Sequence, residues 1–351
     1  MTGVRFLGGA LPEPGLSEQD PLISRITGWI FGRDLDSRLL LSRTWGLAWP
    51  VVVEQALAMV SQVADTAMVG RLGKESTTAV GLSMQPFFLV NALFMGLSTG
   101  TTALVARAVG AGDREEAGKI AGQALVIALV FGLIISTLGY MNADWIIGFM
   151  KAEGPVQEIG AGYVRAMMPG LLLFFVFTIS TGALRGAGDT RTPMLINVGL
   201  NVIHIFTNYV FIYGNLGAPK MGAAGAGLST SISRILGGMA ILVVLTRPGG
   251  KLAVNWKHTV RRFDLVRLKR ILRIGVPAML ERVLTSSGQI AYSRQVAGLG
   301  TEAYAAHSLS LHCESFSYMP GMGFATSATA LVGQRLGAED PDGAERSAYI
   351  A

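Results

Sequence analysis

Residues 95–111 read MGLSTGTTALVARAVGA, and residues 322–338, placed 227 positions later, read MGFATSATALVGQRLGA. The alignment runs without a gap from Pro50 on Pro277, through Glu54 on Glu281, to the end of the chain. Within the 75 positions from 50 to 124, 25 residues are identical to their counterparts. The chain therefore contains an internal repeat, and repeats of this kind are typical of membrane transporters.

The composition places this repeat in a membrane protein. Half of the 351 residues are apolar, only 15% are charged, and the mean hydropathy is +0.46, whereas soluble domains carry about 25% charged residues. Windows of about 20 apolar residues predict membrane-spanning helices. Eight occur, at 44–70, 79–107, 119–150, 160–184, 190–214, 222–246, 270–298 and 304–336. They are too long and alternate too little for a β-barrel, so we predict an all-α polytopic membrane protein.

Lysine and arginine in the connecting segments predict the topology. With the N-terminus in the cytoplasm, the inner segments hold 18 of these residues and the outer segments hold four, as the positive-inside rule requires. We therefore predict a cytoplasmic tail (1–43), a six-helix lobe (44–246), a basic cytoplasmic connector (247–269) and part of a second lobe (270–351). Basic residues from Lys251 to Arg270 indicate an amphipathic helix lying on anionic headgroups.

The same composition excludes other classes of protein. The net charge of +6 resides in an apolar chain, so it indicates a membrane surface rather than a nucleic-acid partner. Cys313 is the single cysteine, which excludes an intrachain disulfide and a thiolate metal cluster. Since no nucleophile–base or metal-ligand spacing is found, we predict that the protein is not an enzyme.

The repeat also predicts how the two copies are related. Six windows separate the two starts, so both copies enter the membrane in the same direction, as parallel repeats about an axis along the membrane normal. The first copy is complete, whereas the second holds only 75 residues from Pro277 onward. We expect the chain to be a fragment of a twelve-helix protein, and a genuine eight-helix protein is the alternative.

Three motifs resemble the multidrug and toxic compound extrusion (MATE) transporters. They are Pro50 with Asp65-Thr66 and the following GRLG (70–73), LRGAGDTRTP (184–193), and GAAGAGLST (222–230). The resemblance runs from about residue 40 to the end and is strongest to the bacterial DinF-like subgroup. It implies two six-helix lobes around a V-shaped cavity, and export of cationic or amphipathic compounds coupled to H⁺ or Na⁺ entry. In the second motif, we expect Asp189 to order a turn.

Asp65 is the principal candidate for ion coupling. A carboxylate at membrane depth costs about 2.5–3.5 kcal/mol, so it faces a cavity or a partner, and burial favours its protonated form. The resemblance places Asp65 on the family's coupling aspartate. It also places Pro50 on a proline whose kink can serve as a conformational switch. The alternatives are an interfacial Asp65 that reaches water and a proline kink that does not switch.

The fifth predicted helix departs from the family pattern. His204 stands where the subgroup has asparagine, and Asn208 stands where it has aspartate. Histidine titrates near pH 6.5, so His204 can replace the missing acid, and we expect Asp65 to approach His204 or Asn208. Thr230 falls on the family's sixth-helix threonine. Helix packing alone is the alternative for both His204 and Thr230. Because only one carboxylate remains, we predict H⁺ rather than Na⁺ as the coupling ion, with no other cofactor.

Glu54 and Glu281 occupy equivalent positions after Pro50 and Pro277. Paired acids would line the inner mouth of a cavity and attract cations, and we add Gln62 and Met59 to this predicted substrate surface. A symmetric pair of structural salt bridges is the alternative. We predict small organic cations or drugs as substrates of a monomer in the bacterial inner membrane. A lipid-linked precursor flippase and a truncated, non-transporting fragment are the alternative functions.

Overall fold

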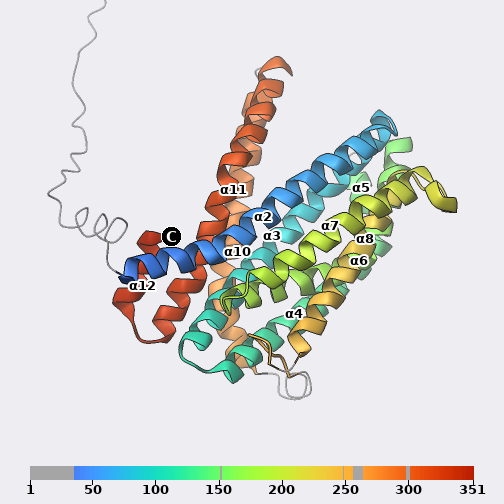
Figure 1. The fold of residues 1–351 in the computed structure, drawn as a ribbon. Helices are drawn as coiled ribbons and strands as arrows, with labels where there is room; N and C mark the ends of the chain where they lie inside the picture. The colour runs from blue at the N-terminus through green and yellow to red at the C-terminus, as the bar shows by residue number, and fades with distance from the viewer. Residues whose placement is uncertain (1–34, 151, 248, 256–263, 298–300) are drawn as a thin grey trace, which may run out of the picture.

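The computed structural model describes residues 35–150, 152–247, 249–255, 264–297 and 301–351, and these residues form helices and turns without a strand (Figure 1). The first copy, which we call the N-lobe, comprises α2 (Leu35–Gly70), α3 (Lys74–Gly110), α4 (Arg114–Met141), α5 (Ala143–Phe149), α6 (Pro155–Gly186), α7 (Arg191–Tyr213), the short η1 (Asn215–Gly217) and α8 (Ala223–Thr246). The second copy comprises α10 (Leu265–Ala297), α11 (Thr301–Gly337) and α12 (Pro341–Ile350).

Helix α6 forms the centre of the N-lobe. Its fully buried side chains lie at helical spacing: Met167, Leu171, Phe175 and Ile179. The Phe175 ring stacks on Phe94 of α3, with the two ring centroids 3.5 Å apart. Gly170 and Gly186 bring the backbone of α6 against α8 and α3, because a Cβ at either position would overlap the neighbouring helix. Small residues permit this close packing between membrane helices.

One turn recurs where a helix ends and the next begins, at residues 110–113 (GAGD), 186–189 (GAGD) and 337–340 (GAED). Its third residue lies in the left-handed region, with φ of +77° at Gly112 and Gly188 and +59° at Glu339. Its aspartate then accepts the amide three residues later, which caps α4 and α12 and joins the turn to the first residues of α7. The expectation that Asp189 orders a turn is confirmed.

The two copies contact each other reciprocally. Each contact between the copies recurs between the residues that correspond to it 227 positions along the chain. Gly96 lies against Met279, and correspondingly Gly323 lies against Val52. In the same way, Gly110 lies against Gln334 and Gly337 lies against Arg107. Pairs of corresponding contacts of this kind are expected when two copies are related by a two-fold axis. Figure 1 shows α2 and α10 rising from the same end of the molecule, so the copies run in parallel, as the repeat predicts.

Membrane-length helices match the predicted windows closely. Among the described residues, six helices are long and apolar enough to cross a membrane: α2, α3, α4, α6, α7 and α8. They coincide with the first six windows. The last two windows correspond to α10 and α11, of 33 and 37 residues, which fall outside that set. Charged residues such as Arg273, Glu281 and Arg282 reduce the hydropathy of α10.

Two predicted boundaries differ from the structure. Helix α2 begins at Leu35, inside the predicted tail, and Leu40 is buried beside Leu331 and Ile350 of the second copy. In the run from Lys251 to Arg270, for which an amphipathic helix is predicted, residues 251–255 are not helical and bury Leu252 and Val254, whereas residues 265–270 form the start of α10. Leu40, Leu252 and Val254 are apolar, so packing against the protein is more favourable for them than exposure to water. Residues 1–34 and 256–263 lie outside the described part of the chain.

Candidate functional site

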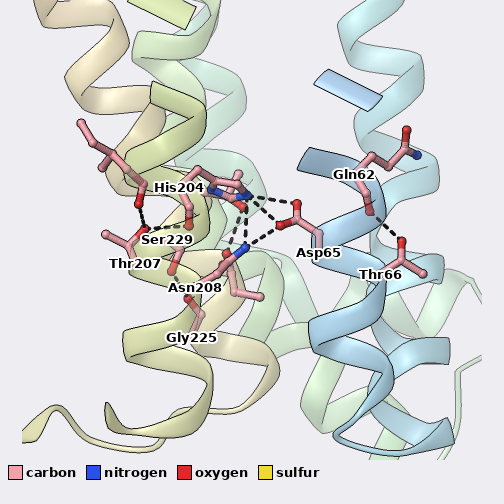
Figure 2. A network of polar contacts seen from close by, with 11 residues as sticks. Gln62, Asp65, Thr66, His204, Thr207, Asn208, Gly225 and Ser229 are labelled. Carbon is pink, nitrogen blue, oxygen red and sulfur yellow. Dashed lines mark hydrogen bonds and ion pairs between the residues drawn. The ribbon is translucent and has the colours of Figure 1, made fainter. Parts of the chain in front are cut away.

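Asp65 of α2 meets two polar residues of α7, as Figure 2 shows. His204 Nε2 lies 3.0 Å from each carboxylate oxygen of Asp65, and Asn208 Nδ2 donates to Asp65 Oδ1. His204 and Asn208 are four residues apart, so both face α2. The Asp65 side chain is 38% exposed, that of His204 is 12% exposed, and Asn208 is fully buried. The structure thus brings together three of the four residues that the sequence predicts for ion coupling.

The surroundings of His204 show which of its two ring nitrogens is engaged. Its Nδ1 is buried and has no hydrogen-bond partner among the described residues. An imidazolium carries a proton on both nitrogens and needs two acceptors. The geometry therefore fits donation from Nε2 to the Asp65 carboxylate, with Nδ1 left without an acceptor in the described part of the chain. A proton added at Nδ1 turns the hydrogen bond into an ion pair, so the two side chains can share an added proton.

The polar face of α7 extends beyond this cluster. Asn197, Asn201, His204 and Asn208 follow one another at helical spacing. The first three of them border a cavity of about 170 Å³, which we call the N-lobe cavity. Its remaining lining comes from α6, α7 and α8: Phe174, Phe177, Leu200, Thr230, Ser233, Arg234 and Gly237. Thr230 therefore shares the cavity with His204, while its hydroxyl donates to the Ala226 carbonyl at 2.9 Å.

Arg234 is a functional candidate that sequence reasoning missed. Its guanidinium carbon lies 4.3 Å from the ring centroid of Phe87 and 4.6 Å from that of Phe174. Cation–π contacts of this kind favour a guanidinium away from water. It is also close enough to Asp65 to interact electrostatically. The sequence contains a signal for this residue, because Arg234 lies in the middle of an apolar helix. The topology prediction, however, rests on basic residues in the loops alone.

Glu54 and Glu281 occupy different environments. Glu54 is 5% exposed and forms an ion pair with Arg185 of α6. Glu281 is exposed and borders a cavity of about 910 Å³ between α3 and α10. The structure does not bring the two acids together at one mouth, because Glu54 faces its own lobe and Glu281 faces the other copy. The position of Glu54 fits the alternative interpretation, a structural salt bridge.

The remaining candidates lie on α2 away from both cavities. Pro50 is buried within the helix, Met59 is half-buried, and Gln62 is exposed. Figure 2 shows the Gln62 side chain directed away from Asp65, while its carbonyl accepts the Thr66 hydroxyl at 2.9 Å. Neither Met59 nor Gln62 borders the two cavities described above. Their role in a substrate surface stays a prediction.

Membrane-length helices in a parallel repeat, with a polar cluster held between two of them, are the architecture of a polytopic membrane protein of the transporter class. A model of the MatE family matches residues 50–210 and 277–351, and the chain belongs to this family. Members of the family are membrane transporters rather than enzymes. The protein is accordingly a multi-pass membrane protein, while its placement in the DinF-like subgroup stays a prediction.

Curated relatives and solved structures agree with this assignment. The probable multidrug resistance protein NorM of Thermotoga maritima is 33% identical over 297 residues, 83% of this chain and 62% of the relative. The probable multidrug resistance protein YoeA of Bacillus subtilis is 29% identical, over 84% of this chain and 64% of the relative. The chain thus spans less than two thirds of the length of these relatives.

Two solved structures share the fold. A crystal structure of a MATE protein in complex with MaL6 has a TM-score of 0.82 at 26% identity, covering 88% of this chain and 68% of that one. A MOP superfamily transporter from Pyrococcus furiosus has a TM-score of 0.79 at 27% identity, covering 88% and 67%. The arrangement of the helices is therefore that of the family.

Proposed function

We propose that the protein is a secondary active transporter that exports small cationic or amphipathic organic compounds in exchange for protons. The observation that carries the proposal is the Asp65–His204–Asn208 cluster, a titratable pair between two helices of a MatE-family lobe. The names of the multidrug resistance relatives support drugs as substrates. The bias of Lys and Arg supports a cytoplasmic N-terminus in the bacterial inner membrane, and we propose a monomer as the working unit.

The charge of the cluster supplies a mechanism for exchange. With Asp65 ionised and His204 neutral, the cluster is negative and attracts a cationic compound. A bound proton neutralises this charge, so the proton and the exported cation compete for the same negatively charged cluster. Such differential binding is what a ligand needs to shift a conformational equilibrium.

The surroundings of the cluster support H⁺ over Na⁺. Hard cations prefer several oxygen ligands, and Asp65 is the single carboxylate in the cluster. The His204 N–H already occupies both of its oxygens.

Binding of ethidium to the purified protein in weakly buffered detergent tests this proposal. We expect ethidium to release protons, recorded with a pH-sensitive dye, and NaCl to release none. Asp65→Asn keeps the shape of the side chain but carries no negative charge, so proton release should disappear. The control is Asp144→Asn, since Asp144 lies in an exposed ion pair with Arg165. Equal proton release from Asp65→Asn would remove Asp65 from coupling, and release by NaCl would favour sodium.

A further inference from the structure

We propose that the N-lobe cavity binds a carboxylate, with Arg234 holding the carboxylate group of a small aromatic acid or zwitterion. The inference adds a carboxylate to the amphipathic compounds of the proposed function, and it rests on that proposal only in taking the bound compound as cargo. Arg234, the two phenyl rings that flank it and the polar face of α7 carry the argument.

Arg234 has hydrogen-bonding capacity that the described residues do not use. A guanidinium offers five N–H donors, and Nη1 of Arg234 is buried without a partner. The Phe87 and Phe174 rings lie 4.3 and 4.6 Å from the guanidinium carbon and satisfy only its faces. Asp65, the acid within electrostatic range, is already engaged by His204 and Asn208. The planar edge of the guanidinium is thus available to a carboxylate, which it matches in a bidentate fashion.

The cavity beside Arg234 has the composition that a small acid requires. Ser233 contributes a hydroxyl that is buried without a partner among the described residues, and the Asn201 amide, which donates one N–H to the Asn197 carbonyl, carries a second N–H. Apolar side chains form the rest of the wall: Phe174, Phe177 and Leu200. The volume of about 170 Å³ is comparable with that of a cavity that holds benzene, about 150 Å³. One aromatic ring with a carboxylate therefore fits both the size and the chemistry.

A purely structural Arg234 is the competing explanation. In that case the guanidinium serves only as a fixed counter-charge to Asp65 and as a packing element between the two phenyl rings. The two explanations differ in one measurable property. A structural arginine gives no preference between an acid and its neutral amide, whereas a carboxylate site does.

Benzoate and benzamide are probes of nearly equal shape and different charge, and their binding to the purified protein in detergent can be followed by calorimetry. We expect benzoate to bind at least ~10-fold more tightly than benzamide, because a hydrogen bond between charged groups is stronger than one to a neutral amide. Arg234→Gln should lose this preference, and Arg234→Lys should retain part of it. Asn201→Leu keeps Arg234 but fills part of the cavity, so it should weaken the binding of both benzoate and benzamide.

The control is Arg165→Gln, which removes a positive charge from the exposed pair with Asp144 and should leave benzoate binding unchanged. Unfolding temperatures measured on each variant without ligand identify those that fail to fold. Absence of benzoate binding to the parent, equal binding of benzamide, or unchanged binding by folded Arg234→Gln overturns the proposal. Proton release by ethidium is a separate measurement, so failure of the coupling mechanism would leave the benzoate result standing.

Discussion

Acidic residues of α2 are paired in two chemically different ways. Glu54 faces the permanently charged Arg185, whereas Asp65 faces His204. Protonating Glu54 would leave a buried guanidinium without its counter-charge, which is strongly unfavourable. Protonating the Asp65–His204 pair instead converts a neutral imidazole into an imidazolium beside a carboxylate. At the scale of single residues, the partner therefore separates a structural acid, Glu54, from the acid that we propose for proton exchange, Asp65.

This difference predicts separate effects of substitution at Glu54. Glu54→Ala leaves the mostly buried Arg185 unpaired, so we expect the free energy of unfolding to fall by about 3–5 kcal/mol. Reversible unfolding in detergent, followed by tryptophan fluorescence, measures it. Asp144→Asn breaks an exposed pair and should cost less than about 1 kcal/mol. A Glu54→Ala variant with parental stability would contradict the structural role of this pair.

Among the elements, the recurrent turn before α4, α7 and α12 explains part of the internal repeat. Asp113 and Asp340 are counterparts, and both cap a helix by accepting a backbone amide. The Gly343 amide, followed by Arg335, holds the pKa of Asp340 below its ordinary value of 3.8. Since a lowered pKa means that the folded state favours the carboxylate, the stabilising effect is present above about pH 4 and is lost as the pH falls further.

Glu339 is the exception within this turn, because a non-glycine residue in the left-handed region costs about 1–2 kcal/mol. Glu339→Gly should therefore stabilise the protein by about 1 kcal/mol. The matched reverse change is Gly112→Ala, where a Cβ meets no atom within 4 Å and only the positive φ is unfavourable. Unfolding in detergent should show shifts of opposite sign, and destabilisation by Glu339→Gly would show that its side chain has another role.

On the scale of the whole molecule, the pseudo-two-fold axis passes between α3 and α11. Gly110 of α3 packs on the backbone at Gln334, and Gly337 of α11 packs on the backbone at Arg107. Backbone cannot move aside as a flexible side chain can. The approach of the two copies therefore depends on glycine at both positions.

Gly110→Ala and Gly337→Ala should each destabilise the contact between the copies by about 1–3 kcal/mol, as overpacking does. The two effects should be similar, because the two positions are related by the axis. Gly162→Ala on α6 is the control, since a Cβ there meets no atom within 4 Å. A large effect at only one of the two glycines would argue against the two-fold relation.

The sequence alone predicted the positions of the helices and the relation between the two copies. Hydropathy located the helices, and the repeat predicted that both copies run in the same direction. The prediction that Asp65 approaches His204 or Asn208 was also correct, because an intramembrane acid needs a polar neighbour and these two residues lie on one face of α7.

The tertiary structure alone decided which face each helix turns inward. In lipid, a helix can be apolar all round, so its hydropathy does not distinguish the face that packs on neighbours from the face that meets lipid. The pairing of Glu54 with Arg185 and the position of Arg234 between two phenyl rings depend on that rotation. The burial of Leu252 and Val254 likewise depends on the chain turning back along the end of α8, where the Val254 amide donates to the Leu245 carbonyl, and no periodicity predicts this turn. Partners of buried charges are contacts between distant segments, and only packing brings them together.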